Sequence, residues 1–281
     1  MNKQIRIILQ NLMLFIIVLI ISLIFIEIIL RLFSHQNLNY TMFDENLMYK
    51  HIPNLEFRYF RQEFDNIIKF NSNGLRDFEY EYKKDKNAYR ILILGDSFPE
   101  ALQVNLNETF AKILEQKLNK ENKKYEIINA GVGGYGTENE FLFFELEGIR
   151  YNPDLVILAF ALNDIDDNLL SPLASLQDNK LVKNIPVKAS LPKRVMLYCS
   201  RYLHFCALIQ SVLLQGLKEN ELLRIIFDKI KISSKGNSKK ITAKSWLDIY
   251  RKEDSGIFKK GLNETFLTIL ELNKIMKKNN I

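Results

Sequence analysis

The triplet Gly95-Asp96-Ser97 is the first candidate for chemistry, because its serine follows a short apolar run. Residues Ile91 to Leu94 predict a buried strand, and a helical pattern follows from about Thr109 to Leu118. In a parallel α/β sheet, residues at the carboxyl ends of strands border the crevice where ligands bind. A serine there can attack an acyl carbon while nearby N–H groups hold the oxyanion. By itself, Gly-Asp-Ser also favours a plain turn.

Two further predicted strands end in glycine-rich or polar residues. The strand 125–129 runs into a loop that contains Gly134, and the strand 155–161 is followed by Asn163. Because parallel strands end at one edge of a sheet, we expect Ser97, Gly134 and Asn163 to converge. Two backbone N–H groups and the asparagine amide would then serve as oxyanion donors. The loop lacks the Lys-[Ser/Thr] pair of a phosphate-binding loop, which argues against nucleotide binding.

The alternation of strands and helices predicts an α/β fold with a parallel sheet. Helical patterns at 109–118 and 138–148 lie between the three predicted strands. The third strand is almost wholly apolar, as expected of a strand buried on both faces. A last helical pattern runs from Gly261 to Lys278.

Residues Leu12 to Leu30 are almost wholly apolar and predict a transmembrane helix. A cleaved signal peptide is the alternative, but no small-x-small cleavage site follows the run. Lys3 and Arg6 precede it and Arg31 follows it, a slight bias that places the amino terminus in the cytoplasm. We therefore expect residues 1–33 to be a cytoplasmic stub and single-pass anchor, with the rest on the extracytoplasmic side.

A polar and aromatic preface, residues 34–88, separates the anchor from the main domain, residues 89–281. Two apolar runs in it, Phe57–Phe60 and Ile67–Phe70, predict edge strands. A turn cluster, Asn71–Gly74, follows them.

The α/β pattern is lost from about residue 166 to 244, where we expect a helical insertion. Val195–Leu214 is apolar enough to raise a second membrane span, but its charged and polar residues favour an amphipathic helix over the site. Cys199 and Cys206 lie about two helical turns apart and could share a face. Free or buried thiols are the simpler interpretation.

The composition argues against several classes of function. The net charge is +6, yet no basic run interleaves with aromatic residues as in a nucleic-acid site. The two cysteines are too few for a disulfide framework, and no Cys-x-x-Cys or histidine cluster indicates a metal. We expect neither a nucleic-acid partner nor a metal or other cofactor.

Taken together, these blocks resemble the SGNH/GDSL hydrolases, a family of esterases and acetyl-transfer enzymes. The three blocks appear as Gly95-Asp96-Ser97-Phe98, Asn129 to Gly134 and Ala161-Leu162-Asn163-Asp164, with Phe and Ala replacing the usual Leu and Gly. The segment Asn71–Asp77 is similar to one that precedes the first block in membrane-anchored members. The resemblance covers about residues 50–281, and it implies a flavodoxin-like three-layer α/β/α fold.

The resemblance also implies roles for individual residues. Ser97 would be the nucleophile, and Gly134 and Asn163 would stabilise the oxyanion. Asp96 and Asp164 would support them. The implied activity is hydrolysis of an acyl or O-acetyl ester of a cell-envelope glycan or lipid.

The chain departs from the family at the fourth block, Asp-x-x-His, whose histidine is the general base. Its only histidines are His35, His51 and His204, and none stands in such a block. We interpret His51 as a satisfied or exposed imidazole and His204 as a surface or packing residue. We expect a chain truncated before this block, with a sheet incomplete at its C-terminal edge. A polysaccharide O-acetyltransferase and a non-catalytic protein that binds a glycan or partner remain alternatives.

Overall fold

The computed structural model describes residues 3–34, 36–120, 124–170, 173–177, 180–219 and 256–281. The chain divides into two compact units, which are described separately. The first unit comprises residues 1–39 and 190–236, and the second comprises residues 40–189 and 237–281. His35 lies outside the described residues, as does part of the predicted insertion. The predicted division at residues 33 and 88 stays a prediction.

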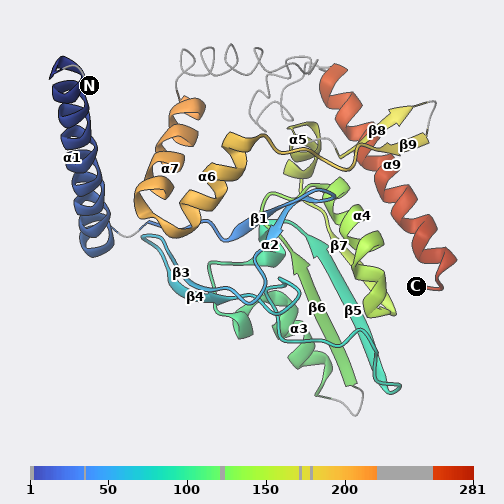
Figure 1. Ribbon diagram of the computed structural model, residues 1–281. Helices are drawn as coiled ribbons and strands as arrows, with labels where there is room; N and C mark the ends of the chain where they lie inside the picture. Colours follow the sequence, from blue (N-terminus) through green and yellow to red (C-terminus); the bar gives the residue numbers. More distant parts are fainter. Residues whose placement is uncertain (1–2, 35, 121–123, 171–172, 178–179, 220–255) are drawn as a thin grey trace. The chain divides into compact units, whose positions relative to one another are not determined.

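A three-stranded parallel sheet forms the centre of the second unit (Figure 1). Strand β5 (Ala88–Gly95) lies between β6 (Lys124–Gly131) and β7 (Leu155–Ala159), which confirms the three predicted strands. The register pairs Gly95 with Gly131 on one side and with Ala159 on the other. The carboxyl ends of the strands are therefore level, and the loops that follow them start from one edge.

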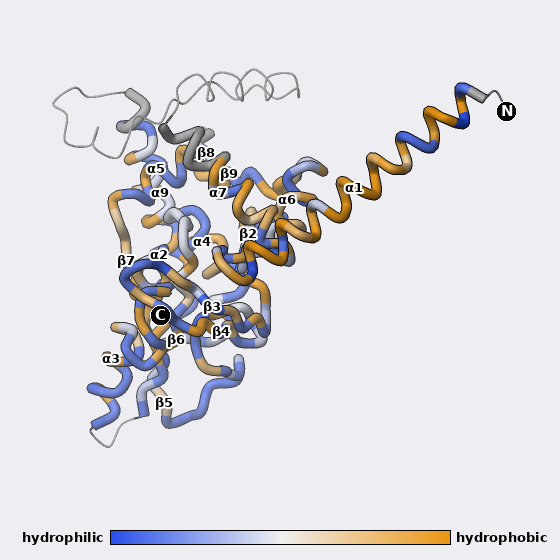
Figure 2. The backbone as a smooth tube through the Cα atoms, turned by 90° about the vertical axis from the view of Figure 1, so that its left-hand side faces the viewer, coloured by the Kyte–Doolittle hydropathy of each residue, from blue (hydrophilic) through white to orange (hydrophobic). Residues whose placement is uncertain are grey.

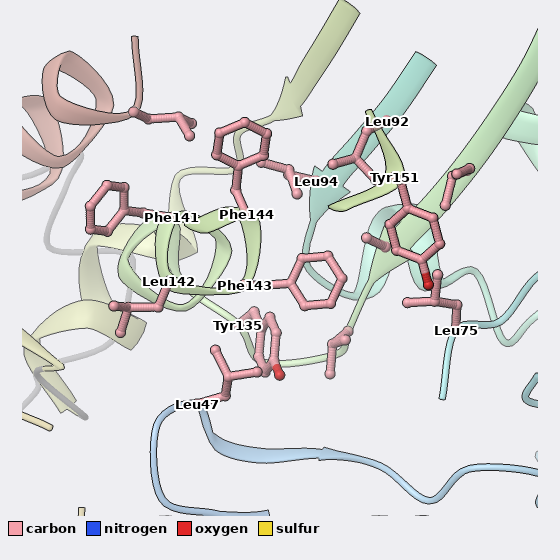
Figure 3. Packing of buried hydrophobic residues seen from close by; sticks show 14 of the residues in the cluster. Leu47, Leu75, Leu92, Leu94, Tyr135, Phe141, Leu142, Phe143, Phe144 and Tyr151 are labelled. Atoms are coloured by element: carbon pink, nitrogen blue, oxygen red, sulfur yellow. The ribbon is translucent and has the colours of Figure 1, made fainter. Parts of the chain in front are cut away.

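Both faces of the sheet are covered, which explains why β5 is an unbroken apolar run rather than an alternating one. Leu92 and Leu94 belong to a cluster with residues of helix α4 (Thr137–Leu146), as Figure 3 shows. Ile91 and Ile93 belong to a second cluster, which includes Ala111 of helix α3. The predicted three-layer arrangement is confirmed.

The predicted helices of this unit are present, but α9 (Gly256–Lys278) begins at Gly256 rather than Gly261, and α5 (Asn163–Leu170) was not anticipated. Helix α3 (Phe110–Leu118) is capped by Thr109, whose side chain accepts a hydrogen bond from the backbone N–H of Lys112. Threonine is a favoured N-cap residue because its oxygen satisfies an otherwise unpaired N–H group. The long last helix, α9, packs against α4 and α5. Two short 3₁₀ helices occupy Leu106–Glu108 and Gly148–Tyr151.

The preface contains two antiparallel hairpins. The predicted edge strands are β3 (Glu56–Phe60) and β4 (Asp65–Lys69), which pair with each other. The hairpin of β1 (Thr41–Asp44) and β2 (Met48–His51) was not anticipated, because its strands are short and only partly apolar.

The described part of the predicted insertion is not wholly helical. Strands β8 (Ala174–Gln177) and β9 (Lys180–Lys183) form an antiparallel pair after α5. Only four residues pair on each strand, which is too short for a periodic sequence signal.

The first unit is helical. Helix α1 (Lys3–Phe33) contains one apolar span, Gln4–Phe33, long enough to cross a membrane by length and composition. It extends beyond the predicted Leu12–Leu30 at both ends. The apolar character along its length is visible in Figure 2.

The stretch Val195–Leu214 is two helices, not the single amphipathic helix that the sequence predicted. Helix α6 (Leu191–Tyr202) ends at Leu203, whose extended backbone separates it from α7 (His204–Glu219). The chain reverses there, and Cys199 and Cys206 form a disulfide with their Cα atoms 5.7 Å apart. The interpretation as free thiols was therefore wrong, because it assumed one continuous helix.

A buried ion pair connects the preface to the layer of α3. The Lys112 Nζ atom lies 2.6 Å from Asp77 Oδ1, and both side chains are almost fully buried. Lys112 also donates to the carbonyl of Ile127 in β6, and Asp77 accepts from the backbone N–H of Asn129 in the same strand. Burial raises the pKa of Asp77 to about 6, although Lys112 opposes the shift.

We predict that Lys112→Met destabilises the folded chain by about 3–5 kcal/mol, since it leaves the Asp77 carboxyl buried without its cation. The matched control is Lys124→Met, which removes exposed ion pairs and should cost far less than Lys112→Met. Chemical denaturation of the detergent-solubilised full chain measures both free energies of unfolding. Equal losses for the two variants would contradict the importance of the pair. Adding Asp77→Asn to Lys112→Met should recover part of the loss.

Candidate active site

The first strand end places Ser97 at the start of a short helix. Asp96 is the N-cap of α2 (Ser97–Glu100), and its Oδ1 atom accepts a hydrogen bond from the Phe98 N–H at 2.9 Å. Aspartate favours this position because it satisfies a free N–H group of the first helical turn. Ser97 is exposed, so its hydroxyl is reachable from solvent.

The third strand end is joined directly to the first. Asn163 begins α5, and its Nδ2 atom donates to Asp96 Oδ2 at 2.9 Å. The same nitrogen donates to Asp167 Oδ2 at 3.1 Å, one helical turn further along. The structure therefore brings Asn163 next to the residue that caps the serine's helix, as level strand ends predict.

The second strand end carries the glycine loop. The Val132 N–H donates to the Gly95 carbonyl at 3.1 Å, which ties this loop to the first strand. Gly134 is exposed and has a φ of +78°, a backbone conformation that favours glycine. A Cβ atom on it would lie 2.8 Å from the Tyr49 hydroxyl oxygen. That hydroxyl donates to the Gly133 carbonyl at 3.1 Å, so Tyr49 fixes the loop from the preface side.

Close packing of the first two loops also requires glycine. A Cβ atom on Gly131 would lie 2.4 Å from the backbone nitrogen of Glu100. One on Gly95 would lie 2.4 Å from Pro99 Cγ, and one on Gly133 would lie 2.6 Å from Glu100 Oε2. Helix α2 thus rests directly on the strand ends.

The preface holds the other end of α2 through buried polar contacts. His51 Nε2 lies 2.7 Å from Glu100 Oε1, and His51 Nδ1 lies 2.9 Å from the Gly74 carbonyl oxygen. A carbonyl only accepts, so Nδ1 carries a hydrogen, and the contact with Glu100 needs one more hydrogen on either partner. Arg76 donates to the carbonyls of Glu100 and Ala101. The interpretation of His51 as a satisfied imidazole is confirmed.

The structure places further carboxyl groups behind the strand ends. Asp164 is fully buried, and its Oδ2 accepts from the Thr137 hydroxyl at 3.1 Å. Burial raises the pKa of Asp164 to about 7, with the Asp96 charge adding to the shift. The Glu140 carboxyl lacks a hydrogen-bond partner among the described side chains, and burial, with the charges of Asp164 and Asp96, raises its pKa well above the ordinary range. Both groups therefore favour the neutral form more than exposed acids do.

Sequence reasoning missed four residues that build this region, namely Tyr49, Glu100, Glu140 and Asp167. Glu100 and Asp167 each follow a predicted site residue by one helical turn, a spacing that could have indicated them. Tyr49 and Glu140 carry no such signal, since their relevance comes from contacts between distant segments. Among the described residues, no group of three or more His, Cys, Asp or Glu side chains could hold a metal ion.

Residues 93–205 match the sequence model of the GDSL-like Lipase/Acylhydrolase family. The match bears out the predicted resemblance to the SGNH/GDSL hydrolases over these residues. It does not test the roles of the individual residues, which stay predictions.

Solved structures of similar proteins include TesA and AlinE4, the latter described as an SGNH-hydrolase family esterase. TesA is 24% identical over 27% of this chain and 42% of its own, with a TM-score of 0.26. AlinE4 is 27% identical over 31% of this chain and 45% of its own, also with a TM-score of 0.26. The chain thus spans less than half the length of either structure. No curated protein matches it.

The raised pKa of Asp164 predicts a pH-dependent stability. Its carboxyl has an ordinary value of 3.8 and a folded value of about 7, so the folded state binds the proton more tightly. Stability should therefore fall as the pH rises from about 4 to 7. We predict that the free energy of unfolding of the wild type falls between pH 5 and 8 by up to about 3 kcal/mol more than that of Asp164→Asn.

Melting temperatures of the detergent-solubilised full chain at the two pH values test this expectation. The control is Asp85→Asn, an exposed residue whose pKa is lowered by the Asn87 N–H and by Lys124, so it titrates below this window. It should keep the wild-type pH dependence. If Asp164→Asn also keeps it, the carboxyl does not titrate in this range.

Proposed function

We propose that the chain is a membrane-anchored SGNH-type hydrolase that acts on ester bonds through Ser97. The observation that carries the proposal is the Asn163–Asp96 hydrogen bond, which joins two of the family's blocks beside an exposed serine. The family match supports ester hydrolysis as the reaction class. The three strand ends are level, as a site built from all three requires.

In the proposed mechanism, Ser97 Oγ forms a bond to the acyl carbon and a base takes its proton. The oxyanion is held by the Ser97 and Gly134 N–H groups and by the Asn163 amide. Collapse of the intermediate breaks the ester C–O bond, and the alcohol leaves with a proton. Water then releases the acyl group from the serine.

To donate to the oxyanion, the Asn163 amide must give up one of its present hydrogen-bond acceptors. Its Nδ2 hydrogens are engaged by Asp96 and Asp167. Burial raises the pKa of Asp167, whose side chain is half-buried, so this carboxyl holds a negative charge less firmly than an exposed aspartate. We propose that the oxyanion replaces Asp167, while the Asp96 contact keeps the amide in place.

Neither histidine among the described residues is placed to act as the base in this mechanism. His51 cannot accept the proton from its position, because both ring nitrogens already have buried partners. His204 belongs to the other unit, where its Nδ1 accepts from the Gln36 N–H. Loss of a triad member typically lowers the rate by about 10⁴–10⁶-fold. Acylation by an activated ester is therefore a better test than turnover.

The proposed substrate is an acyl or O-acetyl ester of a cell-envelope glycan or lipid. Two large apolar side chains are adjacent in sequence to the proposed catalytic residues. They favour a substrate whose acyl group has apolar surface. Phe98 follows Ser97 and is 71% exposed, and Leu162 precedes Asn163 and is 49% exposed. Neither side chain is needed in the core, so both are available to a substrate.

We predict that p-nitrophenyl acetate acetylates Ser97. The acyl group should accumulate, because neither histidine of the described residues is placed to act as a base for water. Intact mass and peptide mapping of the full chain measure the adduct. Ser97→Ala should abolish it, and Asn163→Ala should slow its formation by about 10²–10³-fold, the cost of losing one oxyanion donor. The control is Ser211→Ala, an exposed serine of α7. An adduct that forms equally in Ser97→Ala would overturn the nucleophile assignment.

The non-catalytic alternative is favoured by one observation, the full engagement of His51. This alternative predicts that no Ser97 adduct forms. It also predicts that the chain binds an envelope glycan and that Ser97→Ala leaves this binding unchanged. Transfer of the acetyl group from Ser97 to an added sugar faster than to water would instead identify an O-acetyltransferase.

We further propose that α1 anchors the chain and that the hydrolase lies on the extracytoplasmic side. The length and apolar composition of α1 support the anchor. The Cys199–Cys206 disulfide supports the side, because such bonds persist in oxidising compartments and are rare in the cytosol.

We predict that both cysteines resist alkylation by maleimide-polyethylene glycol in intact cells and in denatured extracts until a reductant is added. A gel shift for two thiols measures the reaction. The control is Cys206→Ser, which leaves Cys199 without its partner. The Cys199 thiol of this variant should be labelled without a reductant. Labelling of both thiols in unreduced wild-type protein would contradict an oxidising location.

A further inference from the structure

Helix α6 carries an exposed apolar stripe on one face. Its members are spaced by four, three and four residues, which places them on the same side of a helix. They are Leu191, Val195, Tyr198 and Tyr202, and each is at least 47% exposed. Ser200, on the opposite side, is buried, and its carbonyl accepts from the Asn39 N–H. The stripe therefore faces away from the unit to which the helix belongs.

The turn after α6 is fixed to the C-terminal end of α1. The carboxylate of Glu27 accepts hydrogen bonds from the N–H groups of His204 and Phe205, each at 3.0 Å. Arg31 bonds to Glu27 and donates to the Tyr202 carbonyl at 3.0 Å. All of these residues belong to the first unit. The C-terminal end of the stripe, at Tyr202, is thus held beside the last turns of α1.

The charges of α6 suit a negatively charged surface. Its twelve residues, Leu191–Tyr202, include three basic side chains and no acidic one. The guanidinium of Arg201 lies 5.2 Å from the ring centre of Tyr202, at the edge of the stripe. Tyrosine and arginine side chains of this kind concentrate at membrane–water interfaces, where an apolar part is buried and a polar tip stays wet.

We propose that the α6 stripe lies in the interfacial layer of the membrane that α1 crosses, with anionic lipid headgroups as its partners. The inference rests on the proposed anchor and does not depend on the esterase activity. An interfacial helix buries its apolar face about 5–10 Å into the headgroup and acyl boundary. The disulfide and the Glu27 contacts hold α6 at the end of the anchor, so the helix reaches this layer without a separate binding event.

Depth-dependent quenching by brominated lipids tests the proposal in the full chain reconstituted into phosphatidylcholine–phosphatidylglycerol vesicles. The single tryptophan of the sequence, Trp246, is changed to Phe, and Tyr198→Trp provides the probe. We expect a blue-shifted emission that is quenched most strongly by bromines near the headgroups. Quenching should weaken when phosphatidylglycerol is omitted.

Two matched probes make the outcome decisive. Lys193→Trp lies on the same helix, roughly 140° around its axis from Tyr198, and should be quenched several-fold less. Phe15→Trp in α1 should be quenched most by deep bromines. An unquenched Tyr198→Trp probe overturns the proposal. A red-shifted emission would then place the probe in water, and a blue-shifted emission would place it against protein, such as a second copy of the chain. Equal quenching at positions 193 and 198 also overturns it, and an unquenched Phe15→Trp removes the anchor on which it rests.

Discussion

The arrangement of the candidate site depends on one buried carboxyl group, that of Asp96. One of its oxygens caps the helix that begins with Ser97, and the other holds the amide of Asn163. The first contact fixes the direction of α2, and the second joins loops that are 67 residues apart in sequence. An aspartate at this position therefore supports both the serine and the asparagine. A shorter or neutral side chain could not make the same two contacts with equal strength.

The preface acts as a support for this arrangement rather than as a linker. Asp77 bonds to the second strand, Arg76 to the end of α2, and His51 to Glu100 on that same helix. These contacts are buried, where each lost partner would leave a costly unsatisfied group. They give a structural reason for the polar composition of the segment Asn71–Asp77, which would otherwise be hard to reconcile with a place inside the fold.

The two units differ in how far their apolar side chains are covered. In the second unit, helices cover both faces of the sheet, and the central strand β5 is almost wholly buried, while the outer strand β7 is only partly buried. In the first unit, α1 and the α6 stripe leave large apolar side chains uncovered. Exposed apolar surface of this extent is unfavourable in water, so it indicates an apolar partner. The membrane proposed above would cover both α1 and the stripe.

The sequence by itself determined the three parallel strands, the two helices between them, the long apolar helix and the positions of Ser97, Gly134 and Asn163 after strand ends. These features depend on local runs and periodicities, which a short window of residues contains in full. The tertiary structure alone decided the break at Leu203 with its disulfide, the roles of Tyr49 and Glu100 in holding the loops, and the burial of Asp164 and Glu140. Each of these arises where segments distant in sequence meet, and the energies of burial and pairing that fix them appear only when the chain is folded.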